Sequence, residues 1–304
     1  MFPASPNTLC ASPASSTSTL TALDDDELRL IWNPKDDALN PRAVPFVPKL
    51  SPSTPPPSPP RRSTQPAAAK PPPIWFPIFT AAARASAIPS HPSRASALVA
   101  SRSWPIEAIA ELAQHFCWRG GDKPDAETPG IAPFAHAVYT AFIRAHGRDV
   151  AQSFLWHLRE CVVGAFIASW DPDCPNAITY RFAPSFAYVA SATAQAAFVG
   201  ELFRRELIPG AHAATCVVAI LKGLNSYEHL EALRGILAAT GPAFWHGTVP
   251  GQGNTAIHRF VATFLETVAP LRPNMSVLGR SLKATDMSDM IVDIEQLVTS
   301  YVQK

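Results

Sequence analysis

The sequence predicts an all-α protein of about eight helices that follow a proline-rich N-terminal region. Two observations lead to this fold class. From residue 104 onward, apolar residues recur at every third or fourth position, which is the period of one face of an α-helix, and we find no convincing run of alternating strand residues. Of the 32 prolines, 21 lie at or before Pro105, so the chain divides near residue 103.

Residues 1–103 are rich in Pro, Ser, Thr and Ala and contain few large apolar residues, a composition that rarely buries a core. We therefore expect a disordered arm over residues 1–103 and a helical domain over residues 104–304, which is long enough for one core. Residues 24–32 read as acidic and then apolar, and they are either a docking motif or an incidental patch. Residues 56–61 are either a polyproline ligand or a spacer. The apolar residues 74–79 either pack onto the domain or form a second docking motif.

The first three helices are expected between residues 104 and 170. The first begins at Trp104, and the pair Gly120-Gly121 ends it, because glycine commonly follows the last helical turn. The second runs over about residues 131–145, and the third follows Gly147. The proline-containing residues 171–175 then break the chain. Asp171 and Asp173 in this segment are interpreted as turn residues and not as a general acid and base.

The fourth helix is expected over about residues 185–207, closed by Pro209-Gly210. Gly200 lies in its middle, where glycine costs about 1 kcal/mol relative to alanine. A glycine at such a position indicates that another helix packs closely against it. The predicted buried face is Val189, Ala192, Ala196, Gly200, Phe203 and Leu207.

Four further helices complete the expected set. The fifth contains residues 216–221 and stops at Gly223. Asn225 and Glu228 have the spacing of a capping box that opens the sixth, and Gly241-Pro242 ends it. Residues 251–254 are expected to be a loop. The seventh and eighth helices cover about residues 257–268 and 290–301.

Three segments carry a family resemblance. Residues 198–203 read Phe-Val-Gly-Glu-Leu-Phe and are followed by Arg204-Arg205-Glu206-Leu207-Ile208; residues 216–221 are an apolar run that ends at Lys222; residues 230–233 read Leu-Glu-Ala-Leu and precede Ala239-Thr240-Gly241. In this order and spacing they resemble the middle domain of translation initiation factor 4G. The resemblance implies a HEAT-like α-solenoid, and eight helices with short connections suit stacked antiparallel pairs.

The resemblance also implies a function. The chain would be a non-enzymatic scaffold that binds translation-initiation or mRNA-handling proteins, among them the DEAD-box helicase initiation factor 4A. The chain departs from the family at both ends: no Asn-Lys-Leu-Thr-like motif lies near residues 104–116, and Arg259 is the one Lys or Arg among residues 254–270. It therefore resembles a short, diverged member. A domain that keeps the fold without its translation partners is an alternative.

The candidate partner-binding residues are Phe203, Arg204, Arg205 and Lys222, and the alternative for the two arginines is a solvated helix face. An RNA-binding helical-repeat protein is a second alternative. Charge argues against it, because phosphate binding needs a basic face. Residues 1–103 hold 10 basic and 6 acidic side chains, whereas residues 104–304 hold 15 basic and 18 acidic side chains.

No catalytic constellation is recognisable. The sequence lacks a Gly-x-Ser-x-Gly elbow, a phosphate loop and a His-Glu-x-x-His motif, so we expect neither an enzyme nor a bound cofactor. His115 and Cys117 lie close together without a second pair at metal-site spacing, so we expect no metal. His136, His146 and His157 are interpreted as ordinary surface or packed histidines.

The five cysteines are scattered, and the first 20 residues lack the basic start and apolar core of a signal peptide. No run of about 18 apolar residues without charge indicates a membrane span. We therefore expect a cytoplasmic protein with reduced thiols, the nucleus being the alternative compartment. The sequence gives no indication of oligomeric state.

Overall fold

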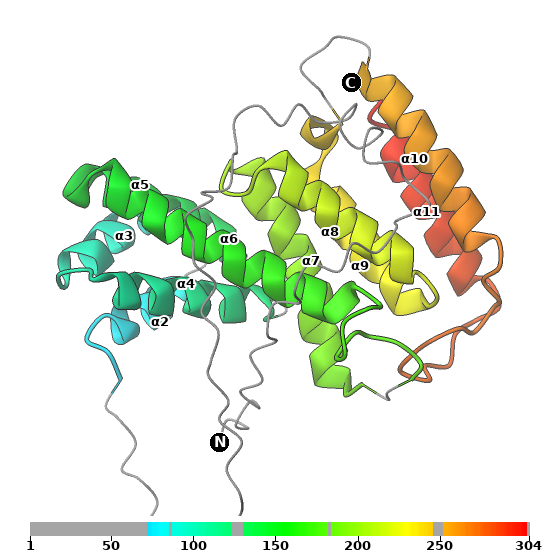
Figure 1. Ribbon diagram of the computed structural model, residues 1–304, viewed down its shortest axis with the longest axis horizontal. Coiled ribbons are helices and arrows are strands. Elements are labelled where there is room, and N and C mark those ends of the chain that lie inside the picture. The colour runs from blue at the N-terminus through cyan, green and yellow to red at the C-terminus, as the bar shows by residue number, and fades with distance from the viewer. Residues whose placement is uncertain (1–71, 85–86, 123–129, 182–183, 246–251, 303–304) are drawn as a thin grey trace, which may run out of the picture.

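The computed structural model describes residues 72–84, 87–122, 130–181, 184–245 and 252–302 (Figure 1). Within these ranges all regular structure is helical. The α-helices are α2 (Phe76–Ala83), α3 (His91–Ala100), α4 (Ile106–Gly120), α5 (Ala132–His146), α6 (Arg148–Trp170), α7 (Phe186–Arg204), α8 (Gly210–Gly223), α9 (Tyr227–Thr240), α10 (Gln252–Val268) and α11 (Asp286–Thr299), with short 3-10 turns η1 (Ile88–Ser90) and η2 (Pro242–Phe244).

The expected all-α class is confirmed for the described part of the chain. Each of the eight helices expected after residue 104 is present, with ends that differ by a few residues in most cases. The seventh is the exception at its start, because residues 252–254, expected to be a loop, already belong to α10. Helix α6 ends at Trp170, directly before the segment where Asp171 Oδ1 accepts a hydrogen bond from the Asp173 amide at 3.1 Å. Such a side-chain contact is typical of a turn.

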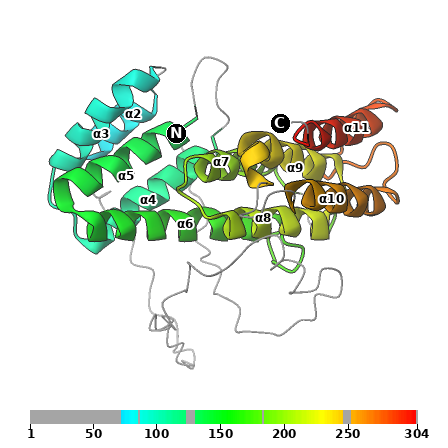
Figure 2. The same ribbon diagram turned by 90° about the horizontal axis from the view of Figure 1, so that it is seen from above.

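The helices follow one another along the long axis of the molecule (Figures 1 and 2). Helices α2 to α5 lie at one end, α7, α8 and α9 lie toward the middle, and α10 and α11 lie side by side at the other end. Helix α6, with 23 residues, packs against α4 and α5 and also against α7 and α8, so it joins the first end to the middle.

The core of the first end is aromatic. The ring of Phe116 on α4 lies 5.6 Å from that of Phe134 on α5 and 5.7 Å from that of Phe154 on α6. Phe142 on α5 lies 5.5 Å from Phe154, measured between ring centroids. All four side chains are fully buried. Their contacts across three helices fix the relative positions of α4, α5 and α6.

Helical structure begins before the expected boundary at residue 103. Trp75 is fully buried, Phe79 on α2 packs edge-on against Phe116 at 5.0 Å, and the Trp104 indole donates a hydrogen bond to the Val99 carbonyl oxygen. The helices α2 and α3 therefore extend the core over residues 72–103. Of the two interpretations of residues 74–79, packing onto the domain is the one the structure shows. Residues 1–71, including the segments 24–32 and 56–61, lie outside the described residues.

Proline content hid these two helices in the sequence. Each of α2, η1 and α3 has a proline in its first turn, at Pro77, Pro89 and Pro92. A proline there removes an amide that has no partner within the helix in any case, so it favours the start of a helix and does not break it.

Replacing Trp75 by alanine tests whether α2 is part of the folded core. We expect Trp75→Ala to lower the free energy of unfolding by about 3–5 kcal/mol, because the side chain is fully buried. Ile74→Ala is the matched control: the neighbouring side chain is 77% exposed, and the expected change is within about 0.5 kcal/mol. Urea unfolding of both variants measures the difference. Equal stability of the two would mean that α2 contributes nothing to the core.

Helix α7 packs against α9 at the glycine that the sequence singled out. A Cβ atom added to Gly200 would lie 2.6 Å from Ala239 Cβ and 2.7 Å from the Ile236 carbonyl oxygen. The backbones of the two helices approach too closely for any side chain at this position. The expected close packing of Gly200 is therefore confirmed.

Gly200→Leu should destabilise the protein by roughly 1–3 kcal/mol or more, because the larger side chain must push α9 away. Gly164→Leu is the control, since Gly164 is exposed on α6 and an added Cβ there meets nothing within 4 Å. Leucine is a better helix former than glycine, so the control should be neutral or stabilised by up to about 1 kcal/mol. Thermal unfolding of both variants decides the matter; a Gly200→Leu protein of normal stability would contradict the close approach.

The expected capping box at α9 is not formed. The helix follows Ser226, and no side chain caps its first amides. Glu228 is instead fully buried and accepts hydrogen bonds from Ser276 Oγ at 2.5 Å and from the Val277 amide at 3.0 Å. These bonds fasten the segment between α10 and α11 to α9. Burial opposes the charge of Glu228, but the hydrogen bonds outweigh it and lower its pKa.

His229 is fully buried beside this carboxylate. Its Nδ1 lies 2.8 Å from Ser226 Oγ, and its ring packs edge-on against Trp170 at 5.1 Å. Burial lowers its pKa from 6.5 to about 4, although Glu228 opposes this change. The folded state therefore holds a neutral imidazole at pH values where the unfolded chain carries a charged one.

His229 makes stability depend on pH. Because its pKa is lower in the folded state, this contribution is intact above pH 6.5 and is lost as the pH falls toward 4. The expected loss by pH 5 is about 2 kcal/mol. Glu228 loses its stabilising charge only below its ordinary pKa of 4.5, so it barely acts in this range. His229→Gln should flatten the stability curve between pH 7 and 5 in urea titrations. An unchanged slope would show that His229 is not the titrating group.

Candidate functional site

The candidate site begins at the last turn of α7, where two arginines share one carboxylate. Glu201 accepts hydrogen bonds from Arg204 Nη2 at 2.6 and 2.7 Å, and its Oε2 lies 3.4 Å from Arg205 Nη2. These residues are three and four positions apart on the helix, so their side chains lie on one face. Arg204 is half exposed, whereas about a quarter of Glu201 and of Arg205 is exposed.

The backbone closes α7 tightly behind these side chains. The Leu207 amide donates to the Leu202 carbonyl oxygen at 3.0 Å, and the Glu206 amide donates to the Phe203 carbonyl oxygen at 2.8 Å. This is the hydrogen-bond pattern of a Schellman motif. Glu206 has a φ of 60°, a left-handed conformation that glycine usually adopts. This strained conformation of Glu206 turns the chain directly after Arg205.

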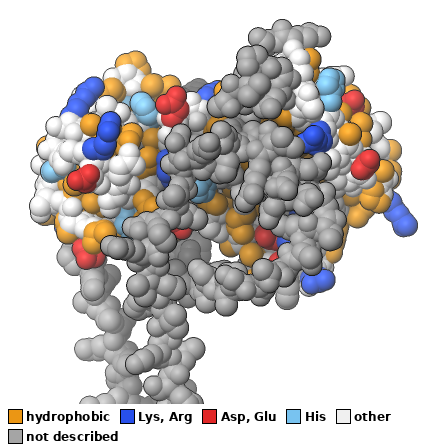
Figure 3. All heavy atoms as spheres, turned by 45° about the horizontal axis from the view of Figure 1, so that its top comes forward, with side chains coloured by type: hydrophobic (Ala, Val, Ile, Leu, Met, Phe, Trp, Pro, Cys, Tyr) orange, Lys and Arg blue, Asp and Glu red, His pale blue; other side chains and the backbone are white. Residues whose placement is uncertain are grey.

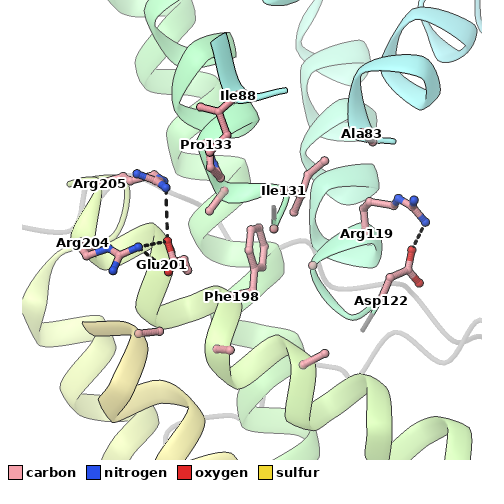
Figure 4. Close-up of a pocket in the computed structure, with 16 residues that line it drawn as sticks. Ala83, Ile88, Arg119, Asp122, Ile131, Pro133, Phe198, Glu201, Arg204 and Arg205 are labelled. Atoms are coloured by element: carbon pink, nitrogen blue, oxygen red, sulfur yellow. Dashed lines mark hydrogen bonds and ion pairs between the residues drawn. The ribbon is translucent and has the colours of Figure 1, made fainter. Parts of the chain in front are cut away.

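A hollow of about 500 Å³ lies beside this turn (Figure 4). Phe198 lies between two charged groups: Glu201 with Arg204 and Arg205 on one side, and Arg119 with Asp122 on the other. The wall is largely apolar and comes from α2, η1, α4, α5, α7 and α9. The apolar and glycine residues that line it are Ala83, Ile88, Gly120, Gly130, Ile131, Ala132, Pro133, Ala194, Ala197, Phe198 and Ala239.

A second hollow of about 310 Å³ adjoins the first along α3 and α5. Ile88, Pro133 and Arg205 line both, so the two hollows are parts of one groove. We refer to them together as the α5–α7 groove. Arg205 stands at the junction, and its Nε atom is buried without a hydrogen-bond partner among the described residues. Because protein covers this atom, a ligand in the groove would meet other parts of the Arg205 side chain, which is 27% exposed.

The α5–α7 groove is basic on balance. Among the described residues its lining holds Arg119, Arg144, Arg204 and Arg205 but only the carboxylates of Asp122 and Glu201. His91 and His136 also line the second hollow. An apolar floor between arginines can take a ligand that carries both an apolar side chain and an anionic or carbonyl acceptor.

The structure brings together only two of the four sequence-predicted site residues. Arg204 and Arg205 line the groove. Phe203 does not line it; its ring is half-buried and packs edge-on against Phe244 at 5.8 Å. Lys222 lies near the C-terminal end of α8, about 18 Å along that helix from its first residue, Gly210. It binds Asp171 at 3.1 Å and Asp173 at 2.6 Å and so ties α8 to the turn after α6.

Sequence reasoning missed Arg119, Ile131 and Pro133 as groove residues. Each lies at the end of its helix or next to it, where the local pattern indicates only a start or a stop. Phe198 belonged to the motif that carries the family resemblance, but it was not among the residues of the predicted buried face of that helix. No local signal distinguishes these residues, because α4, α5 and α7 meet only in the folded chain.

His115 and Cys117 on α4 pack into the protein near the groove. His115 packs against the rings of Trp75 and Trp118, at 5.2 and 4.9 Å, and burial lowers its pKa. Burial also raises the pKa of Cys117 to about 12, so its thiol is protonated at neutral pH and is a poor nucleophile and metal ligand. Within the described ranges, no three His, Cys, Asp or Glu side chains gather closely enough to hold a metal ion.

Comparisons of the chain with protein-family models, with curated proteins and with solved structures found no match. The resemblance to the middle domain of initiation factor 4G therefore stays a prediction. Among the described helices, none is both long and apolar enough to span a membrane.

Proposed function

We propose that this chain is a non-enzymatic scaffold that resembles the middle domain of initiation factor 4G and binds a protein partner in the α5–α7 groove. One observation carries the proposal. The three segments that resemble that family are the consecutive helices α7, α8 and α9, and the two arginines that follow the first segment line the groove. The first segment thus contributes to the packing of the helices, and the two arginines directly after it contribute to the candidate site.

The order of helix contacts supports a HEAT-like solenoid as the finer description of the fold. Helix α4 packs on α6, α7 on α9, and α9 on α11, so neighbouring layers contact one another along the molecule. In a solenoid each helical pair contacts mainly its neighbours, and the stacked surface forms an extended binding face. The groove would be one stretch of that face.

The partner that we propose is a protein of translation initiation or mRNA handling in the cytoplasm or the nucleus, with the helicase initiation factor 4A as the first candidate. A protein ligand suits the groove better than RNA does. The groove has an apolar floor, and two carboxylates offset part of its charge. On the coloured part of the face in Figure 3, Lys and Arg side chains are dispersed among acidic and apolar ones, whereas RNA binding needs a basic stripe.

Calorimetric titration of the full chain with initiation factor 4A tests the proposal. The full chain is needed, because a fragment that begins at residue 104 would lack α2 and α3. A dissociation constant in the micromolar range or below would support an initiation-type scaffold. Single-stranded RNA, titrated at two salt concentrations, runs in parallel. An absence of helicase binding would refute this partner, and RNA binding that weakens steeply with salt would favour the RNA alternative.

Charge reversal at the end of α7 should weaken partner binding. We expect Arg204→Glu combined with Arg205→Glu to raise the dissociation constant about tenfold, because arginines in an interface often contribute more than 1 kcal/mol. The melting temperature should fall only modestly, because the ion pair of the half-exposed Arg204 contributes about 0.2–1 kcal/mol, although Arg205 is about three-quarters covered.

Arg148→Glu combined with Arg259→Glu is the matched control for that experiment. It changes the net charge equally at positions that do not line the groove. If the control weakens binding as much as the double reversal on α7, the effect is one of overall charge. If neither variant changes the affinity, the groove is not the partner site.

A further inference from the structure

The described lining of the α5–α7 groove holds four arginines and two carboxylates, so the groove has an excess of positive charge. Arg205 lines both hollows and shares the single carboxylate of Glu201 with Arg204. The neighbouring floor is formed by Ile88, Ile131 and Phe198, which offer no polar side-chain atoms. An occupant that suits this arrangement presents carboxylates to the arginines and one or more large apolar side chains to the floor.

The chain itself carries such a sequence in residues 24–32. Asp24, Asp25, Asp26 and Glu27 are followed by Leu-Arg-Leu-Ile-Trp. These four carboxylates are the majority of the six acidic residues in residues 1–103. The change from acidic to apolar within nine residues matches the change from arginine rim to apolar floor in the groove.

The connection is long enough. Residues 33–71, 39 in number, separate Trp32 from the first described residue, and a segment of this length can span up to about 130 Å. The described chain begins close to the groove in sequence, since Ala83 and Ile88 already line it. Attachment to the same chain also raises the local concentration of the segment near the groove.

We propose that residues 24–32 of this chain bind in the α5–α7 groove, with the acidic run at Arg204 and Arg205 and the apolar residues on the floor around Phe198. The inference rests on the proposed function in that both use the same groove. It adds regulation: the segment and the partner protein compete, so the partner must displace residues 24–32 in order to bind.

Photo-cross-linking of the full chain tests this proposal. p-Benzoylphenylalanine replaces Trp32, the protein is irradiated at low concentration, and mass spectrometry maps the cross-linked peptides. We expect cross-links within one chain to residues of the groove floor, chiefly Ile131, Pro133 and Phe198. Cross-links to other surfaces, cross-links found only between two copies, or no cross-links at all would overturn the proposal.

A charge exchange shows whether the arginines direct the contact. Replacing Asp24, Asp25, Asp26 and Glu27 by lysine should reduce the yield of groove cross-links about fivefold, as expected for the loss of partly exposed ion pairs. Adding Arg204→Glu and Arg205→Glu to this variant should restore the yield. Circular dichroism of each variant confirms that the helices remain folded. If the cross-link yield is the same in all three proteins, the proposed pairing of the acidic run with the two arginines is wrong.

The helicase titration separates the two proposals. If residues 24–32 compete with the partner, the lysine variant should bind initiation factor 4A several-fold more tightly than the unaltered chain does. Groove cross-links without any helicase binding would support this inference while the proposed function fails. Helicase binding without groove cross-links would overturn this inference and leave the proposed function standing.

Discussion

The close contact of α7 with its neighbours determines the rest of this structure. At Gly200 the backbone of α7 meets the backbone of α9, and an added Cβ would be 2.7 Å from the Ile236 carbonyl oxygen. On its other side, the ring of Phe198 fills the space that a side chain at Gly120 would need at the end of α4. Two glycines on different helices therefore hold α7 between the first end of the molecule and the middle. A larger residue at Gly200 would meet the backbone of α9, and a larger residue at Gly120 would displace the ring of Phe198.

The groove is a consequence of this placement. Helix α7 reaches the junction of α4 and α5 with Phe198 as the floor, and its last turn carries Arg204 and Arg205 to the rim. The positive φ of Glu206 then turns the chain directly after Arg205. The same packing that stabilises α7 thus leaves an open, partly charged recess beside it, and the ends of several helices form its walls.

The local sequence pattern was sufficient to predict the features that depend on neighbouring residues in the chain. Apolar periodicity located the eight helices after residue 104, and the glycine at position 200 indicated that another helix packs closely against it. Helices α2 and α3 were missed because prolines at helix starts increase the proline content of a segment, just as prolines in a disordered arm do. Glu228 was misinterpreted because its partners, Ser276 and Val277, lie almost 50 residues away, whereas its spacing from Asn225 suggested a cap. At the site, Arg204 and Arg205 followed from one helix, but Arg119 and Pro133 join them only through tertiary structure.

The carboxylate of Glu201 sets how strongly the groove can hold a ligand. It already accepts hydrogen bonds from Arg204 and lies within ion-pair distance of Arg205, so an incoming carboxylate must share or displace these contacts. The net gain is then the difference between two similar interactions. Binding of this kind favours moderate affinity and ready exchange. The scaffold that we propose would need both properties in order to exchange residues 24–32 for a partner protein, because an unpaired cluster of arginines would hold its first anionic ligand too tightly to release it.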